Sequence, residues 1–249
     1  TTIPERLRPH YKEKIIYLPH SYMPTDNTWK ISTKKPIARK EMGLPEDGFV
    51  FCCFNANYKI TPREFDIWMR LLHKVEGSVL WLGNYKQLTK DNLQKEAKLR
   101  RIDPSRLIYS EWSSQEDHLA RHKLADLFLD TFSFNAHSTA TDALWAGLPM
   151  ITKKGEQFVA RCAASFLNAV GLPELIVKTD QEYEALALEL ATNKILLASI
   201  KEKLLKNRTT TPLFDTETYT RNLEKAFEAT YKNCLQAKRP KDIFVKNIK

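Results

Sequence analysis

The chain of 249 residues lacks the glycine-rich and acidic motifs by which many nucleotide sites are recognised. Its seven glycines form neither a G-x-G-x-x-G fingerprint nor a P-loop, so binding of NAD or FAD and hydrolysis of ATP lose support. No Asp-x-Asp motif is present, so we expect no metal ion to bridge the phosphates of a ligand. A diphosphate would then be neutralised by lysine, histidine and helix N-termini.

Long apolar runs are missing as well. No stretch reaches the roughly 18 uninterrupted apolar residues of a membrane span, and TTIPERLRPHYKEK at the start lacks the apolar segment of a signal peptide. We therefore expect neither a membrane span nor secretion, and a cytoplasmic location. The four cysteines agree, because no pair has metal-binding spacing and all four read as reduced thiols.

Positive charge is in excess. The chain has 39 basic and 30 acidic residues, a net charge of +9, which favours anionic ligands. Nucleic acid is one candidate and a merely solvated basic face is another, but no RNA-recognition or helix-turn-helix signature accompanies the charge. A nucleotide diphosphate suits the same sign, so we expect no nucleic-acid partner.

From residue 49 onward, short β-branched or aromatic runs alternate with amphipathic segments of helical period. This alternation indicates βαβ units and predicts an α/β fold with a doubly wound, Rossmann-like parallel sheet. The apolar continuity of the runs suits strands that are covered on both faces. The predicted strands are residues 49–55, 78–84, 107–112, 126–131, 149–153 and 175–178.

Capping-box patterns mark the starts of three helices, at residues 61–64, 113–116 and 179–182. The first of these helices is predicted to run to about Val75. Long helices close the domain over residues 194–208 and 216–236, separated by the breaker TTTPLFD.

Prolines interrupt residues 1–42, where only 14–19 is typical of a strand. We interpret 1–42 as a remnant of a preceding domain plus a linker, with the boundary near residues 37–43. Residues 43–236 are the predicted ligand-binding domain, and 237–249 a loose basic tail.

In a doubly wound sheet of order 3-2-1-4-5-6, ligands bind beyond the carboxyl ends of the strands where the order reverses. The fourth strand leads into His137, Ser138 and Thr139, which begin a helical pattern ended by Gly147. Free backbone N–H groups at such a helix start favour a phosphate. Lys59, after the first strand, would be a second cation there. An ordinary Ser/Thr cap beside a surface histidine is the alternative.

His118 and His122 have the spacing of zinc-binding helices, but the intervening glutamate and a third ligand are missing. Two solvated histidines explain the pattern better, so no metal site is predicted. Asp142 lies one turn into the phosphate helix, where an acid also complements the helix dipole.

Several stretches together resemble the C-terminal catalytic half of the protein O-GlcNAc transferase family. They are FVFCCFNANYKITP, SVLWL, SEWSSQEDHLARHKLADLFLDT, FNAHSTATDALWAGLPMIT, ARCAASFLNAVGLPELI and PLFDTETYTRNLE. IIYLPHSYMPTD resembles the end of the family's N-terminal catalytic half, and the resemblance covers about residues 10–235. It implies the C-terminal domain of a two-domain glycosyltransferase of the GT-B type, with C-terminal helices, from a bacterial-type member.

The resemblance also implies roles for single residues at a donor site. Two positions depart from the animal enzymes: Ala56 replaces a glutamine, with Asn57 as the candidate substitute, and Gln115 replaces a lysine that contacts ribose or phosphate. The implied donor-binding residues are His137, Ser138 and Thr139 for the diphosphate, Lys59 for the phosphates and the leaving group, His118 and Arg121 for the uracil, Ser113 through its backbone, and Asp142 for the ribose.

The implied reaction is transfer of N-acetylglucosamine from UDP-N-acetylglucosamine to Ser or Thr hydroxyls of an acceptor protein, inverting, metal-independent and without a further cofactor. The family's repeat array and most of its N-terminal catalytic half would be the other partners. Since little of that half is present, we expect this chain alone to bind uridine nucleotides weakly and to transfer no sugar. A cytoplasmic protein N-glucosyltransferase that uses UDP-glucose and a non-catalytic UDP-binding module remain alternatives.

Overall fold

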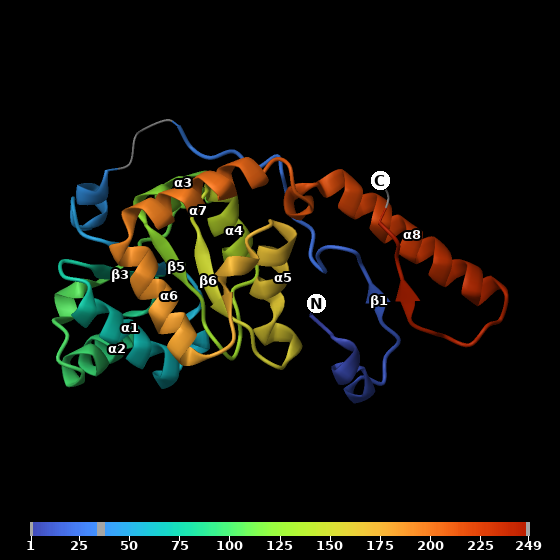
Figure 1. Cartoon of the computed structure of the whole chain (residues 1–249), viewed down its shortest axis with the longest axis horizontal. Helices are drawn as coiled ribbons and strands as arrows, with labels where there is room; N and C mark the ends of the chain where they lie inside the picture. Colours follow the sequence, from blue (N-terminus) through green and yellow to red (C-terminus); the bar gives the residue numbers. More distant parts are fainter. Residues whose placement is uncertain (1, 34–37, 248–249) are drawn as a thin grey trace.

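A computed structural model describes residues 2–33 and 38–247 of the chain, and its largest feature is a six-stranded parallel sheet (Figure 1). The strands lie in the order β4-β3-β2-β5-β6-β7, which is 3-2-1-4-5-6 in chain order. The predicted doubly wound sheet is therefore confirmed, although each strand is shorter than expected. The strands are β2 Val50–Cys53, β3 Val79–Leu82, β4 Leu107–Tyr109, β5 Leu127–Leu129, β6 Met150–Lys153 and β7 Ile176–Val177.

The α-helices are α1 Pro62–Lys74, α2 Gln87–Leu99, α3 Gln115–Arg121, α4 Ser138–Ala146, α5 Cys162–Ala169, α6 Asp180–Thr192, α7 Lys194–Asn207 and α8 Thr216–Leu235. The 3-10 helices are η1 Glu5–His10, η2 Arg39–Met42, η3 Asn57–Lys59, η4 Pro104–Arg106, η5 His122–Leu124, η6 Phe158–Ala160, η7 Pro173–Leu175 and η8 Pro212–Phe214. Helix α1 packs against α6, and α3 against α4. All residues of β2, β3, β5 and β6 are buried, as expected of strands that are covered on both faces.

Two of the three predicted capping boxes form as expected. The Thr61 backbone N–H donates to Glu64 Oε1 at 3.0 Å, and Thr179 and Glu182 exchange hydrogen bonds of 3.1 Å. The third box is displaced by one residue, because the Oγ of Ser114, not that of Ser113, accepts from the Asp117 backbone N–H at 3.3 Å. Because Ser113 and Ser114 are adjacent, the sequence did not show which of them caps the helix.

The two ends of the described chain pair with each other. Strand β1, Ile16–Tyr17, and strand β8, Ile243–Phe244, form a second, parallel sheet of two strands (Figure 1). The strand predicted within residues 14–19 is confirmed, whereas the expected loose tail is wrong for residues 243–244. The rings of Tyr17 and Phe244 stack at 4.5 Å. The proposed boundary reaches Ile37, which lies outside the described residues, and the domain bounds stay a prediction.

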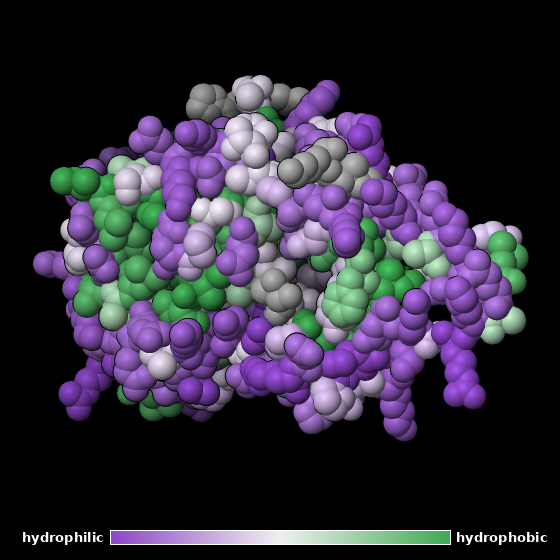
Figure 2. All heavy atoms as spheres, turned by 45° about the vertical axis from the view of Figure 1, so that its right-hand side comes forward, coloured by the Kyte–Doolittle hydropathy of each residue, from purple (hydrophilic) through white to green (hydrophobic). Residues whose placement is uncertain are grey.

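Polar groups cover most of the face shown in Figure 2, and apolar areas interrupt them on both sides of the view. Helix α8 contributes exposed Phe227, Tyr231 and Leu235, which are spaced four residues apart and so share one side of the helix. No helix among the described residues is long and apolar enough to cross a membrane. The described cysteines are all free thiols, as expected.

Candidate functional site

The start of helix α4 presents unpaired backbone donors. His137 is the N-cap, and its carbonyl accepts from the N–H groups of Ala140 and Thr141 at 3.0 and 3.2 Å. The N–H groups of His137, Ser138 and Thr139 have no acceptor among the described residues. Helix α4 ends at Gly147, in the left-handed conformation with φ 87° that glycine adopts readily, as predicted. The free amides and the helix dipole make this end suited to an anion.

The side chain of Thr139 is held by the sheet rather than left free. Its hydroxyl donates to Asn55 Oδ1 at 2.7 Å, across from the end of β2. Ser138, by contrast, is exposed. A phosphate at this helix start would therefore meet the amide of Thr139, with the Ser138 hydroxyl as an additional donor.

The imidazole of His137 faces the protein. Its Nδ1 pairs with the Tyr22 hydroxyl at 2.9 Å, and its Nε2 is buried. Burial and the nearby charge of Lys59 lower the pKa of His137. Both ring nitrogens are enclosed, so the free donor of His137 is its backbone N–H. The predicted phosphate contact through the side chain stays a prediction.

Lys59 lies at the end of η3, beside the loop that leads into α4. Its Nζ donates to the Asn135 carbonyl at 2.9 Å and lies 4.1 Å from the ring centroid of Phe134. Burial lowers the pKa of Lys59, while Asp130 opposes the shift. The ammonium thus lies on the loop that leads into α4, and its contact with phosphate stays a prediction. Asn57 does not join it, because its amide points to Thr89 of α2, at 3.5 Å.

A second cluster joins α3 to α4. His118 Nε2 lies 3.9 Å from Asp142 Oδ2, and Gln115 Nε2 donates to Asp142 Oδ1 at 3.4 Å. Arg121 donates to His118 Nδ1 at 2.9 Å and to the Glu111 carbonyl at 2.7 Å. The structure therefore brings together four of the residues expected to hold the base and the ribose.

Ser113 lies in the loop before α3. Its hydroxyl is buried without a partner among the described residues. The role expected of Ser113 uses its backbone, so that role stays a prediction.

The protonation states within this cluster follow from burial. Burial and the charge of Arg121 lower the pKa of His118 to about 4, whereas burial raises the pKa of Asp142 to about 6 against the hydrogen bond from Gln115. At neutral pH His118 is neutral, with its proton on Nε2 because Nδ1 accepts from Arg121. The contact between His118 and Asp142 is thus no ion pair. An ionised Asp142 can accept hydrogen bonds from ribose hydroxyls.

Uridine carries no phosphate, so its binding tests the titration of Asp142 without the titration of a phosphate group on the ligand. Ribose hydroxyls donate best to an ionised carboxylate, so lowering the pH from about 7 to about 5 should weaken uridine binding about fivefold as Asp142 takes up its proton. The Asp142→Asn variant should bind more weakly at neutral pH and lose the pH dependence. Titrations followed by NMR measure both. An unchanged pH profile in this variant would show that another group titrates.

His122 is not part of a ligand site. It is fully buried, and its Nδ1 bonds to the His118 carbonyl at 2.7 Å. The expectation of two solvated histidines is wrong, because the second one fills the core behind the first. Within residues 2–33 and 38–247, no group of three or more His, Cys, Asp and Glu side chains is placed to hold a metal ion.

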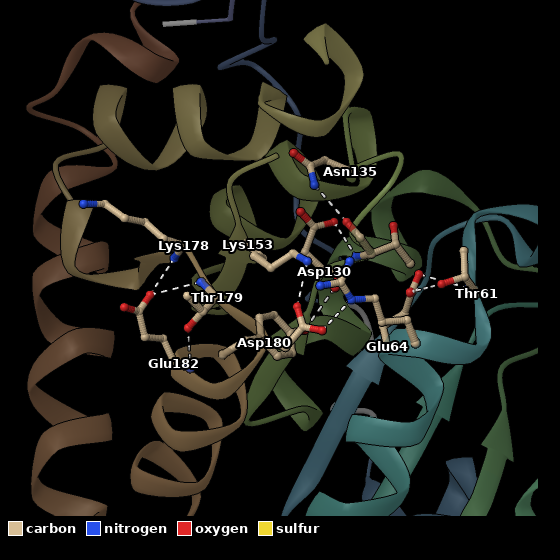
Figure 3. A network of polar contacts seen from close by, with 12 residues as sticks. Thr61, Glu64, Asp130, Asn135, Lys153, Lys178, Thr179, Asp180 and Glu182 are labelled. Atoms are coloured by element: carbon tan, nitrogen blue, oxygen red, sulfur yellow. Dashed lines mark hydrogen bonds and ion pairs between the residues drawn. The ribbon is translucent and has the colours of Figure 1, made fainter. Parts of the chain in front are cut away.

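Sequence reasoning missed the buried polar residues behind the site. Asp130 is fully buried at the end of β5, where its carboxylate accepts from Thr152 Oγ1 at 2.6 Å and from the Ala136 N–H at 2.7 Å. Figure 3 shows Asp130 near Asn135, with the pair of Lys153 and Asp180 beside them. Burial raises the pKa of Asp130 to about 7, and these hydrogen bonds oppose the shift. The apolar run of the strand gave no sign of this network.

Comparisons with known proteins agree with the fold. The sequence model of glycosyl transferase family 41 matches residues 30–223. A probable UDP-N-acetylglucosamine–peptide N-acetylglucosaminyltransferase of Arabidopsis thaliana is 37% identical over 222 residues, and a UDP-N-acetylglucosamine–peptide N-acetylglucosaminyltransferase of Caenorhabditis elegans is 40% identical over 187 residues. These matches cover 87% and 75% of this chain but only 23% and 16% of the relatives.

Among solved structures, a lysine-to-methionine mutant of the Thermobaculum terrenum O-GlcNAc transferase superposes with a TM-score of 0.82 at 27% identity. It covers 95% of this chain, which in turn spans 44% of that protein. The resemblance found in the sequence is confirmed. The chain therefore belongs to glycosyl transferase family 41 and has the GT-B fold of the C-terminal catalytic half of the protein O-GlcNAc transferases.

Proposed function

We propose that this chain is the donor-binding half of an enzyme that transfers N-acetylglucosamine from UDP-N-acetylglucosamine to Ser or Thr hydroxyls of proteins. The names of the Arabidopsis and Caenorhabditis relatives support this donor and a peptide acceptor. The chain spans about a quarter or less of the length of these relatives, so the full reaction belongs to a longer protein.

The observation that carries the proposal is that two groups able to neutralise a phosphate lie near the start of α4. The unpaired amides of His137, Ser138 and Thr139 form the first group. The ammonium of Lys59, bonded to Asn135 in the loop before α4, is the second. A diphosphate needs both charge and directed donors, and this corner of the sheet supplies both.

The chemistry follows from this arrangement. The acceptor hydroxyl oxygen attacks C1 of the sugar, the bond from C1 to the β-phosphate oxygen breaks, and UDP leaves with the bonding electrons. Lys59 and the α4 amides neutralise the charge that develops on UDP. The proton of the hydroxyl passes to a base in the completed cleft. Single displacement inverts the configuration at C1, and the proposal includes neither a metal ion nor a cofactor besides the donor.

The proposal assigns the acceptor side to other parts of the protein, namely the N-terminal catalytic half and the repeat array. The exposed stripe of Phe227, Tyr231 and Leu235 on α8 supports such a covering partner, since exposed aromatic and apolar groups at helical spacing are typical of an interface. We place the enzyme in the cytoplasm. This chain alone should show no transferase activity.

Donor competition tests the proposal. With UDP bound to the chain, UDP-N-acetylglucosamine should displace the UDP at a lower concentration than UDP-glucose does. GDP should compete poorly, because the base contacts fit uracil. Tighter displacement by UDP-glucose would favour an N-glucosyltransferase. Binding of UDP without transfer by a chain that includes the N-terminal half would favour a non-catalytic module. Steeply salt-dependent binding of RNA or DNA, unaffected by UDP, would contradict the proposal.

A further inference from the structure

Two loops must keep a fixed spacing if one diphosphate is to meet both Lys59 and helix α4. Lys59 follows β2, and His137 follows β5. The two strands are neighbours in the sheet, with Cys52 paired to Phe128, but the ladder ends before either loop begins. The spacing of the two phosphate-binding groups therefore depends on side chains beyond the strand ends.

The buried side chain of Asn55 joins these loops. Asn55 is 1% exposed, and its Oδ1 accepts from the Thr139 hydroxyl at 2.7 Å. Its Nδ2 donates to Thr131 Oγ1 at 2.8 Å and lies 3.4 Å from Asp130 Oδ1. The side-chain oxygen of Asn55 thus bonds to the start of α4, and its side-chain nitrogen bonds to the loop after β5.

The same chain of hydrogen bonds reaches Lys59. Thr131 Oγ1, which accepts from Asn55, donates to the Phe134 carbonyl at 2.6 Å, and Asn135 Nδ2 donates to the Thr131 carbonyl at 2.8 Å. These two bonds hold the Phe134 ring and the Asn135 carbonyl, which the Lys59 ammonium contacts. Because Asn135 and Thr131 are fully buried, water cannot replace either bond without opening the loop.

We propose that Asn55 is a positioning residue that sets the spacing between Lys59 and the amides of α4, so that both bind the same diphosphate. This inference rests on the proposed function. Asn55 itself touches no phosphate, because its amide is fully engaged within the protein. It acts through Thr139 on one side and through the Phe134 and Asn135 loop on the other.

The test compares two ligands that differ only in the diphosphate. In the Asn55→Ala variant, the affinity for UDP should fall about tenfold, whereas the affinity for uridine should stay within about twofold. The Thr139→Val variant, which removes only the bond from α4 to Asn55, should weaken UDP about threefold by the same reasoning. This milder variant keeps the test decisive if Asn55→Ala does not fold.

Ser78→Ala is the matched control. The Ser78 hydroxyl is buried at the opposite end of the sheet, where it donates to the Val75 carbonyl at 2.6 Å. Its loss should lower stability without changing the ratio of UDP to uridine affinity. A second readout is the pKa of Lys59, followed by NMR of the isotope-labelled ε-methylene group of lysine. This pKa should rise in Asn55→Ala, because the ammonium leaves its partly buried position and gains water.

The outcomes separate the inference from the proposed function. If the wild-type chain does not bind UDP, the proposed function fails. If the wild type binds UDP but Asn55→Ala binds it equally well, or loses UDP and uridine affinity in the same proportion, the positioning role of Asn55 is overturned. An unchanged Lys59 pKa in that variant would also overturn it.

Discussion

The Lys59→Met variant is expected to bind UDP about 10- to 100-fold more weakly than the wild type, with uridine affinity unchanged. Methionine keeps the length and most of the apolar stem of the side chain but removes the ammonium, which donates to the Asn135 carbonyl in the loop before α4. A charge-assisted contact to phosphate should be lost, and within residues 2–33 and 38–247 no other lysine lies over the Phe134 ring. Isothermal titration calorimetry with the two ligands measures the difference.

Lys153 provides a matched control for this variant. Its Nζ also lies 4.1 Å from a phenylalanine ring centroid, that of Phe132, but its charge is paired with Asp180 at 2.7 Å. Lys153→Met should lower stability and leave the UDP affinity within about twofold, because it takes no charge from the anion-binding end of α4. Equal losses of UDP affinity in both variants would mean that net positive charge, not the position of Lys59, attracts the nucleotide.

The Asp130→Ala variant should lose about 3 kcal/mol or more of unfolding free energy. The Asp130 carboxylate is fully buried and accepts from Thr152, from the backbone N–H groups of Thr131 and Ala136, and more distantly from Asn55. Alanine leaves these donors buried without an acceptor, and each unpaired donor costs its desolvation. Urea denaturation followed by circular dichroism measures the loss.

Asp130→Asn separates the role of hydrogen bonding from that of charge. Asparagine keeps one acceptor oxygen, so it should be less destabilising than alanine by about 1 kcal/mol or more. Two variants of equal stability, both within about 1 kcal/mol of the wild type, would show that the network around Asp130 contributes little to the fold.

The strand order was predictable because it follows from short-range patterns and one rule of handedness. Residues 49–54 and 127–129 are apolar without alternation, which predicts strands that are covered on both faces. Because crossovers between parallel strands are right-handed, six such strands can be arranged in the sheet in only a few orders. The start of α4 was predictable for a similar reason, since Ser138 and Thr139 precede a short apolar helix that glycine ends.

The parts that were missed depend on contacts between distant segments. The pairing of Tyr17 with Phe244 joins two strands of only two residues each, too short to carry a period in either segment. Tyr22 reaches His137 from a proline-rich stretch that has no pattern of its own. Asn55 looked like one polar residue at a strand end, and only the structure shows that it joins two loops.

The burial of His122 shows the same limit in a single residue. His118 and His122 share one helical face by spacing, and that spacing cannot distinguish a ligand pair from one histidine at the site with another behind it. In the structure the rings lie 4.6 Å apart, with the second enclosed by the core. Gln115 and Asp142, placed by the resemblance, do meet at this cluster.

The most direct test of the donor site is an NMR titration of the isotope-labelled chain, comparing UDP with uridine. UDP should shift the backbone amide signals of His137, Ser138 and Thr139 more than any others, and uridine should shift the signals near His118 and Asp142 while leaving those three almost unmoved. If UDP instead causes its largest shifts elsewhere, or moves the three α4 amides no more than uridine does, the diphosphate does not bind at the start of α4.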